Sequence, residues 1–169
     1  AFKRHATSKI QNLEDLSSIE TLGFRGEALP SIASVSMFTA LSSEDDSNAY
    51  ELIINGGEFK SCKPAAGLTG TTCKVQNLFY NTPARRKFLK KPETEQAVIN
   101  SMMRRFMLSR PNVEFKMTSN KKIVYDVPSQ SLYKRINAIY GSAFKKGILP
   151  VEFKKEPYTI SGFTGNLSL

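Results

Sequence analysis

The segment from Gly23 to Leu29, Gly-Phe-Arg-Gly-Glu-Ala-Leu, has the composition of a phosphate-binding turn. Its two glycines allow a tight bend and a close approach of the backbone to a ligand, because glycine has no Cβ. The apolar spacing that follows predicts a helix beginning at Gly26 or Glu27, whose free N–H groups and dipole favour an anion. Arg25 would add a charged donor for phosphate oxygens. The segment is neither a Walker A loop nor a dinucleotide-binding fingerprint, and a turn that only caps a helix explains the same residues.

A second polar cluster, Thr7-Ser8-Lys9, places hydroxyl groups beside a lysine, a combination suited to phosphate or nucleotide contacts. The end of a helix with a basic residue is the alternative. His5 has no Cys, Asp or second His at ligand spacing, and Cys62 and Cys73 make no zinc pattern, so the sequence predicts no metal ligands. It also holds no recognisable Ser-His-Asp set. We therefore expect no complete catalytic centre within this chain.

Aromatic side chains lie beside a dense basic run between Phe79 and Lys91. Residues 1–84 hold seven basic and nine acidic side chains, a net charge of −2, whereas residues 85–169 hold seventeen and six, a net charge of +11. This asymmetry favours a polyanion-binding face on the second half, although a solvated, solubilising surface explains it too. Lysine and arginine contacts to phosphates would give salt-dependent DNA affinity. The candidate DNA contacts are Arg85, Arg86, Lys87, Lys90 and Lys91.

The elements that must position these groups follow from hydrophobic spacing and turn residues. The predicted helices are 12–22 with an Asn12 cap, 93–108, and 132–144. Val98, Ile99, Met102, Met103 and Phe106 would form the buried stripe of the second of these helices. The predicted strands are 37–41, 50–55, 58–63, 71–78, 113–117, 123–127, 151–155 and 158–162. Grouped strands with helices between them predict an α+β fold with mixed or antiparallel sheets.

The composition of the chain limits the kinds of protein it can be. The chain has 169 residues, of which 40% are hydrophobic and 23% charged, values typical of a globular protein. No apolar run approaches the roughly 18 residues of a membrane span, which excludes an integral membrane protein of the helical kind. We expect Cys62 and Cys73 to be buried thiols of a reducing compartment, with Cys73 and Val75 on the inner face of one strand.

Four stretches together resemble one family. They are RHATSKI at 4–10, LGFRGEALPSIASVS at 22–36, GTT at 70–72 and LFYNTPARRKFL at 78–89. In order and spacing they are similar to the N-terminal ATPase region of MutL-type DNA mismatch-repair proteins. The resemblance implies a two-layer, Bergerat-type ATPase fold, shared with gyrase, Hsp90 and histidine kinases, here partial and followed by the start of a ribosomal-S5-like transducer domain.

The same resemblance implies an ATP site that uses Mg²⁺. Its nucleotide-binding positions would be Thr7, Ser8, Lys9, Gly23, Phe24, Arg25, Gly26, Glu27, Ala28, Leu29 and Thr71. The family's catalytic Glu, its Mg²⁺-binding Asn and its Asp-Asn-Gly-x-Gly motif are not in this sequence, and we expect them upstream. The transducer lysine that reaches the γ-phosphate is expected beyond Leu169.

We therefore expect an internal piece of a MutL protein, inactive by itself, from a chain that in full is a weak, Mg²⁺-dependent ATPase. Residues 1–128 would complete the ATPase domain, and residues 129–169, after Pro128 and a Ser-rich stretch, would open the transducer. The implied partners are DNA, a second MutL-type chain and a MutS-type mismatch-recognition protein. The implied location is the cytoplasm or nucleoid, or the nucleus of a eukaryote. The alternatives are a DNA-binding or assembly module without nucleotide function, and another enzyme of the same superfamily, such as a topoisomerase subunit.

Overall fold

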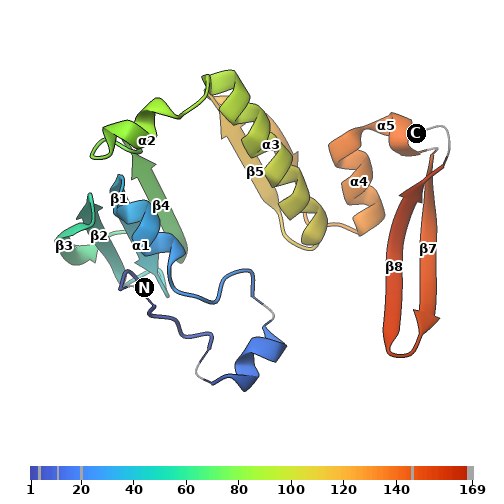
Figure 1. The fold of residues 1–169 in the computed structure, drawn as a ribbon, viewed down its shortest axis with the longest axis horizontal. Helices are drawn as coiled ribbons and strands as arrows, with labels where there is room; N and C mark the ends of the chain where they lie inside the picture. The colour runs from blue at the N-terminus through green and yellow to red at the C-terminus, as the bar shows by residue number, and fades with distance from the viewer. Residues whose placement is uncertain (4, 11, 20, 146, 167–169) are drawn as a thin grey trace. The chain divides into compact units, whose positions relative to one another are not determined.

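The structure is a computed structural model that describes residues 1–3, 5–10, 12–19, 21–145 and 147–166. The chain divides into two compact units, Ala1–Leu89 and Lys90–Leu169, and each is described by itself. Helices and antiparallel strands occur in both units (Figure 1). The predicted α+β class is therefore confirmed.

The first unit is built on a four-stranded antiparallel sheet of order β3-β2-β1-β4. Its strands are β1 (Met37–Ser43), β2 (Ala49–Asn55), β3 (Glu58–Ala65) and β4 (Gly70–Gln76). A 3₁₀ turn η1 (Glu14–Ser18) and helix α1 (Ala28–Ala33) precede the sheet, and α2 (Pro83–Lys87) follows it. Pro30 lies in the first turn of α1, the part of a helix where its missing N–H costs nothing.

The core of the first unit lies between α1 and the sheet. Phe38 and Ala33 are 1% and 2% exposed, and Ala40 and Ile54 complete the cluster. Phe2 packs its ring against that of Phe38, with centroids 5.1 Å apart. Because strand side chains alternate between faces, only one face of β1 supplies this core.

A glycine turn joins β2 to β3, as the Asn55-Gly56-Gly57 sequence predicts. Gly56 and Gly57 have φ values of +58° and +89°. The N–H of Gly56 donates to Ser36 O, and that of Gly57 donates to Ala33 O, at 2.9 and 3.0 Å. These bonds tie the hairpin to the end of α1, so α1 and the sheet hold one another in place.

The second unit begins with a long helix, α3 (Pro92–Ser109). A hairpin of β5 (Phe115–Ser119) and β6 (Lys122–Val127) follows, then α4 (Leu132–Tyr140) and α5 (Ser142–Lys145), then a hairpin of β7 (Ile148–Lys155) and β8 (Tyr158–Gly165). None of the helices in the described ranges is long and apolar enough to span a membrane.

The second unit is held together by a buried arginine. Arg135 is fully buried, as is Met107. Its Nη1 donates to Met107 O at 3.4 Å, and its Nη2 lies 2.7–2.9 Å from the carbonyl oxygens of Pro111, Val113 and Pro128. The guanidinium also lies over the ring of Phe115, 5.5 Å from its centroid. Burial lowers the pKa of Arg135, because water no longer stabilises the charge.

Two expectations about burial are wrong. Cys62 and Cys73 are exposed, because β3 and β4 are the edge strands and nothing in the described part of the chain covers them. The predicted stripe of α3 is mostly exposed as well, with Val98, Ile99, Met102 and Phe106 between 38% and 55% accessible. The helix instead packs through Gln96, which accepts a hydrogen bond from Ser119, and through Met107.

Two predicted helices are shorter than expected. The helix over 12–22 is only η1, and the Asn12 N–H donates to the Asp15 carboxylate instead of the Asn12 side chain forming a cap. The helix over 132–144 is interrupted at Gly141, whose φ of +84° ends α4 and separates it from α5.

Candidate functional site

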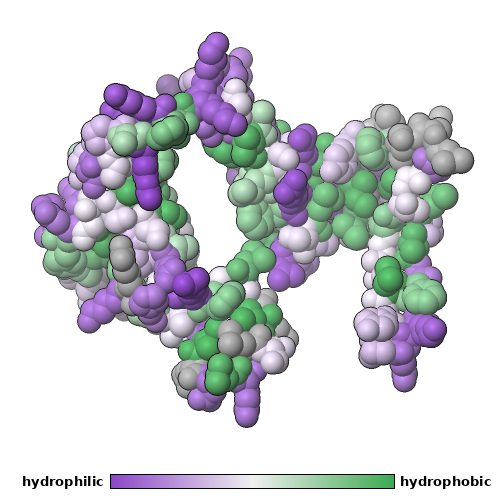
Figure 2. All heavy atoms as spheres, viewed as in Figure 1, coloured by the Kyte–Doolittle hydropathy of each residue, from purple (hydrophilic) through white to green (hydrophobic). Residues whose placement is uncertain are grey.

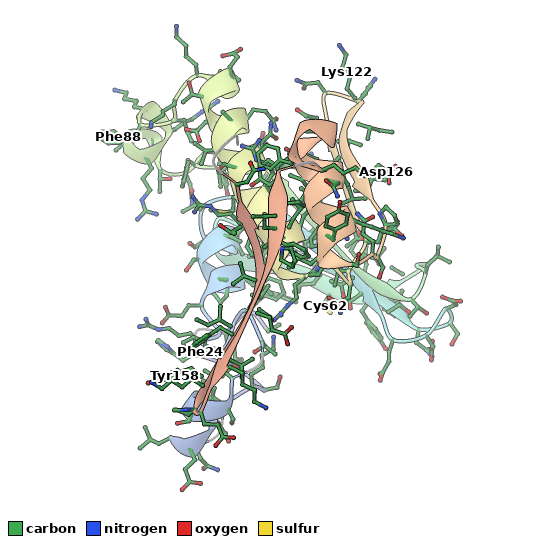
Figure 3. All side chains as sticks on the ribbon, turned by 90° about the vertical axis from the view of Figure 1, so that its right-hand side faces the viewer. Phe24, Cys62, Phe88, Lys122, Asp126 and Tyr158 are labelled. Carbon is green, nitrogen blue, oxygen red and sulfur yellow. The ribbon has the colours of Figure 1, made fainter. Side chains whose placement is uncertain are left out.

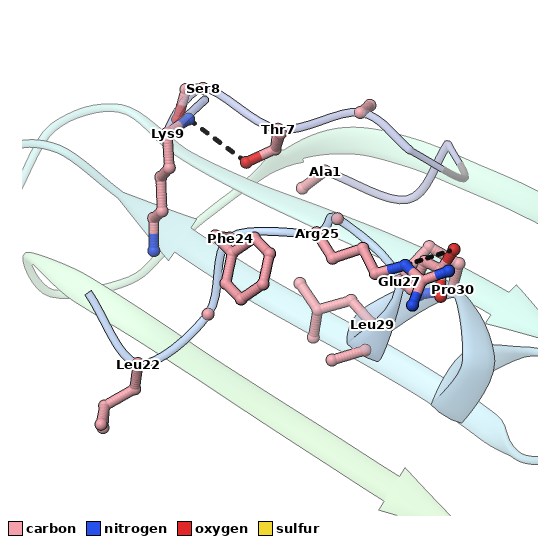
Figure 4. Close-up of a pocket in the computed structure, with 14 residues that line it drawn as sticks. Ala1, Thr7, Ser8, Lys9, Leu22, Phe24, Arg25, Glu27, Leu29 and Pro30 are labelled. Atoms are coloured by element: carbon pink, nitrogen blue, oxygen red, sulfur yellow. Dashed lines mark hydrogen bonds and ion pairs between the residues drawn. The ribbon is translucent and has the colours of Figure 1, made fainter. Parts of the chain in front are cut away.

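The candidate site is a pocket of about 760 Å³ in the first unit, between two loop segments. One segment contributes Ala6 to Lys9 and the other Leu22 to Pro30, with Ala1 beside them (Figure 4). Within the first segment the Lys9 N–H donates to the Thr7 hydroxyl at 3.2 Å. Two hydroxyl residues and a lysine therefore line the same pocket as a glycine-containing turn.

Gly26 brings the two segments together. Its φ is +66°, a left-handed conformation that disfavours residues with a Cβ. A Cβ at this position would lie 2.3 Å from Ala6 O and 2.8 Å from Ala6 C. Glycine is thus required both by its backbone conformation and by its neighbour. Gly23 differs, since no heavy atom lies within 4 Å of a Cβ built there.

Glu27 contacts His5, just before the first segment, and Arg25 of its own segment. Its Oε1 lies 3.1 Å from His5 Nδ1 and 3.3 Å from Arg25 Nε. The side chains of His5 and Arg25 are more than 70% exposed, so water competes strongly for both contacts. Arg25 is therefore held only loosely and remains available to an anion that enters the pocket.

The structure brings the two predicted phosphate-binding segments to one pocket. Thr7, Ser8, Lys9 and all residues from Gly23 to Leu29 line the pocket. Thr71 is not among its lining residues. It lies on β4, where its hydroxyl shares a 2.8 Å hydrogen bond with that of Ser42 on β1.

Sequence reasoning missed four contributors to the pocket, Ala1, Ala6, Leu22 and Pro30. The last three adjoin the predicted motifs, and that position was the available signal, whereas nothing in the sequence pointed to Ala1. The contact of His5 with Glu27 had no such signal, because these residues are separated by a loop of twenty residues or so.

The loop that precedes Thr71 is bonded to a carboxylate from another loop. Asp46 Oδ1 accepts hydrogen bonds from both the N–H and the hydroxyl of Thr69, each at 2.8 Å. These two bonds lower the pKa of Asp46. They fix the loop that enters β4 just before Thr71.

The basic run surrounds α2 at the end of the first unit. Arg85, Arg86 and Lys87 are exposed on α2, and hydrophilic side chains gather at this helix in Figure 2. Thr82 is the N-cap residue of α2, but its hydroxyl is buried and makes no capping hydrogen bond. Lys90 and Lys91 follow α2 in the chain and belong to the second unit.

Among the residues that the structure describes, no group of three or more His, Cys, Asp or Glu side chains is arranged to hold a metal ion. The one carboxylate lining the pocket, Glu27, already contacts His5 and Arg25. Mg²⁺ needs several oxygen ligands, so the described lining does not by itself make a site for it.

No protein-family model matches the chain. Curated relatives do: it is 42% identical over 166 residues to the DNA mismatch repair protein MutL of Geotalea daltonii, which covers 98% of the chain and 28% of that protein. It is 44% identical to MutL of Clostridium perfringens and to MutL of Haemophilus influenzae, over 100% and 96% of the chain. The chain thus spans about a quarter of the length of these relatives.

Solved structures agree with the sequence relatives. The Aquifex aeolicus MutL ATPase domain complexed with ADP matches with a TM-score of 0.68 and 27% identity, over 85% of this chain and 56% of that one. The ATPase domain from the bacterial mismatch repair endonuclease Aquifex aeolicus MutL matches with a TM-score of 0.67 and 25% identity, over 92% and 57%.

Proposed function

Since the chain belongs to the MutL family and has the fold of part of its Bergerat-type ATPase region, we propose that the pocket is part of an ATP-binding site. The observation that carries this proposal is the meeting of Thr7-Ser8-Lys9 with the turn at Gly26. Polyphosphate recognition needs backbone N–H groups, hydroxyls and a cation around one space, and this pocket offers all three. The related domain that was crystallised with ADP supports the same assignment.

Each segment has a proposed part in binding. Lys9 is a mobile point charge for terminal phosphate oxygens, and the hydroxyls of Thr7 and Ser8 are donors beside it. Arg25 would leave Glu27 for a phosphate, because a multiply charged anion competes well with an exposed carboxylate. Thr71 would act from the sheet rather than from the pocket wall. Mg²⁺ would screen phosphate charge when bound, with ligands other than the described lining.

For the intact protein we propose DNA mismatch repair through an ATP-driven switch. ATP with Mg²⁺ would order the two loop segments, favour pairing of two MutL-type chains and close them over DNA, and hydrolysis would reset the state. A MutS-type protein is the proposed upstream partner. Residues 1–128 are the proposed part of the ATPase domain and residues 129–169 the proposed start of the transducer.

The test compares two lengths of chain. The 169-residue chain should neither hydrolyse ATP nor bind it tightly, whereas a longer chain that begins further upstream should do both. Turnover is measured by phosphate release and binding by titration of a fluorescent ADP analogue. Comparable turnover by the two chains would refute the proposal that the catalytic groups lie outside this sequence.

We propose the exposed basic run as the DNA footprint. Arg85, Arg86 and Lys87 make none of the ion pairs found in the described residues, so their charges are available to phosphates. Charge reversal of these three and of Lys90 and Lys91 should remove most of the salt-dependent DNA affinity. Unchanged affinity and salt slope would show that the footprint lies elsewhere.

The exposed basic run also supports an alternative function, a DNA-binding or assembly module without nucleotide function. That alternative leaves the lining of the pocket unexplained. A nucleotide titration of the longer chain separates the two, because a pure DNA-binding module would give no saturable nucleotide signal at any concentration.

A further inference from the structure

The C-terminal end of α1 is held by two loops that are distant from each other in the sequence. Four consecutive carbonyl oxygens, those of residues 33–36, each accept a hydrogen bond from these loops. The turn between β2 and β3 supplies two backbone N–H groups. The loop before α2 supplies the other two donors. Phe79 N–H donates to Val35 O at 2.6 Å. Asn81 Nδ2 donates to Ser34 O at 2.9 Å. Because hydrogen bonds are directional, these four fix the rotation of α1 and its position along its axis.

Asn81 lies where α1 and the two loops meet. A Cβ built on Gly56 would lie 3.0 Å from Asn81 Nδ2 and 2.7 Å from the Tyr80 hydroxyl, so the loop before α2 packs closely on the hairpin turn. Asn77 and Phe79 have left-handed φ values of +51° and +63°, which residues with a Cβ adopt only where their surroundings require it. Of the four donors, Asn81 is the only side chain, and it is therefore the one that a substitution can remove.

The other end of α1 lies in the candidate site. Its first three residues, Ala28, Leu29 and Pro30, line the pocket. A helix of six residues rises roughly 9 Å, so a shift at the bonded end is carried to the pocket over a short distance. Ala33 packs α1 against the sheet, but apolar contact is not directional. The hydrogen bonds therefore determine how α1 is set in the pocket wall.

The hold on α1 is made before α2 begins. α2 has no buried residue, and Phe88, which follows it, is 85% exposed and lies among outward-pointing side chains in Figure 3. Asn81 is itself exposed, although its amide group is bonded to α1. A smaller side chain at Asn81 would thus leave no cavity, and its cost in stability should be that of one hydrogen bond.

We propose that Asn81 is a positioning residue for nucleotide binding. Its side-chain N–H holds the end of α1, and through α1 it holds residues 28–30 at the pocket. The inference rests on the proposed ATP site and adds to it a residue that does not line the pocket. Without this bond, α1 and the turn at Gly26 move relative to Thr7, Ser8 and Lys9. The phosphate-binding groups then converge less often, and nucleotide affinity falls while the fold remains.

The first experiment titrates the longer chain with a fluorescent ADP analogue. Asn81→Ala should weaken binding about fivefold, the factor that one hydrogen bond of ordinary strength supplies. Asn81→Asp should have a similar effect, because a carboxylate keeps the size of the side chain but has no N–H to donate. In steady-state turnover, KM for ATP should rise with kcat unchanged, since the lost bond serves binding and not the chemical step.

Ser34→Ala is the matched control. The Ser34 hydroxyl donates to Ser31 O at 2.8 Å, so this substitution removes a side-chain hydrogen bond at the same end of α1 and keeps the carbonyl that Asn81 reaches. The affinity of this variant for nucleotide should equal that of the unmodified chain. Urea denaturation of the 169-residue chain should give Asn81→Ala and Ser34→Ala similar midpoints, and a difference in affinity then has a cause other than stability.

The second experiment needs no nucleotide. Amide hydrogen exchange of the 169-residue chain reports on α1 through two N–H groups. Ser31 N–H donates to Glu27 O, and Ser34 N–H donates to Pro30 O, each at 3.0 Å. Asn81→Ala should speed exchange at both amides about fivefold, because α1 opens more often once its end is released. Exchange in β1 should stay as in the unmodified chain.

The outcomes separate the positioning role from the ATP site on which it rests. The role is overturned, while the site stands, if Asn81→Ala leaves either nucleotide affinity or exchange in α1 unchanged. It is also overturned if Asn81→Asp binds nucleotide like the unmodified chain, or if Ser34→Ala weakens binding equally. If the unmodified longer chain gives no saturable nucleotide signal, the site and the role are overturned together. Faster exchange in α1 and weaker binding, both confined to the Asn81 variants, support both.

Discussion

Substitution of Gly26 by alanine should open the pocket while its neighbour Gly23 tolerates the same change. At Gly26 the new methyl group would lie 2.3 Å from Ala6 O, and ordinary contact begins near 3.4 Å. The Ala6 carbonyl must therefore retreat by about 1 Å. At Gly23 nothing lies within 4 Å of the added carbon.

The magnitude follows from the backbone as well as from the clash. A left-handed conformation costs a residue with a Cβ about 1–2 kcal/mol. Gly26 has such a conformation, with φ at +66°. Because Ala6 to Lys9 is a surface segment, we expect it to move away rather than the sheet to unfold. A penalty of this size lowers the population of the closed arrangement about 5- to 30-fold.

Amide hydrogen exchange on the 169-residue chain measures this change directly. Faster exchange is expected at Ala6, whose N–H donates to Lys3 O, and at Lys9, whose N–H donates to Thr7. Exchange in β1 should stay as in the unmodified chain. In a longer chain that binds nucleotide, Gly26→Ala should weaken binding and Gly23→Ala should not. Equal effects of the two substitutions would refute the argument from the Ala6 contact.

Two further predictions concern stability and pH. Arg135→Met should lower the free energy of unfolding of the second unit by about 3 kcal/mol, because it leaves buried carbonyls without a donor. Urea denaturation measures this change. Lys134→Met is the control, and it should have little effect because Lys134 is exposed. The hydrogen bonds that Asp45 accepts from Ser47 and Asn48 lower its pKa from 3.8 to about 2, so the stabilisation is complete above pH 4 and is lost as the pH falls through 2. Proton NMR of the Ser47 and Asn48 amides should titrate near pH 2, and a midpoint near 3.8 would contradict this.

Local chemistry decided the parts of the fold that the sequence predicted well. Asn55-Gly56-Gly57 fits a turn that needs positive φ at two positions, and that turn forms wherever the flanking strands can pair. Pro30 limits the start of α1 to its own turn, whatever packs around it. Such signals act within a few residues, so the structure they specify can be predicted without knowledge of the rest of the molecule.

Burial, by contrast, depends on what packs against an element. The spacing of Val98, Ile99 and Met102 correctly predicts a helix, yet these side chains are largely exposed and the buried residue of the helix is Met107. Cys73 alternates as a buried strand residue would, but its strand lies at an edge of the sheet. Periodicity identifies a face, whereas only the partner element determines whether that face is covered.

The candidate site shows the same division. Composition singled out Thr7 to Lys9 and Gly23 to Leu29 separately, as two stretches suited to phosphate. The two stretches meet because Gly26 passes close to Ala6. Local residue spacing cannot predict a contact between residues so far apart in the sequence. Only the resemblance to a family placed both stretches at one nucleotide before the geometry was known.

The predicted boundary at Pro128 rests on a composition that fits two kinds of segment. A proline followed by serines is typical of a linker, and it is equally typical of a loop between a strand and a helix. Here β6 ends at Val127, and α4 begins at Leu132 behind a Ser131 cap. Arg135 of α4 bonds to Pro128 O and to the end of α3 at Met107 O, so the backbone on both sides of the proposed division is held by one buried cation. Movement of a transducer beginning at residue 129 would therefore act on α3 through Arg135, because a buried guanidinium that releases these carbonyls loses hydrogen bonds that compensate its burial.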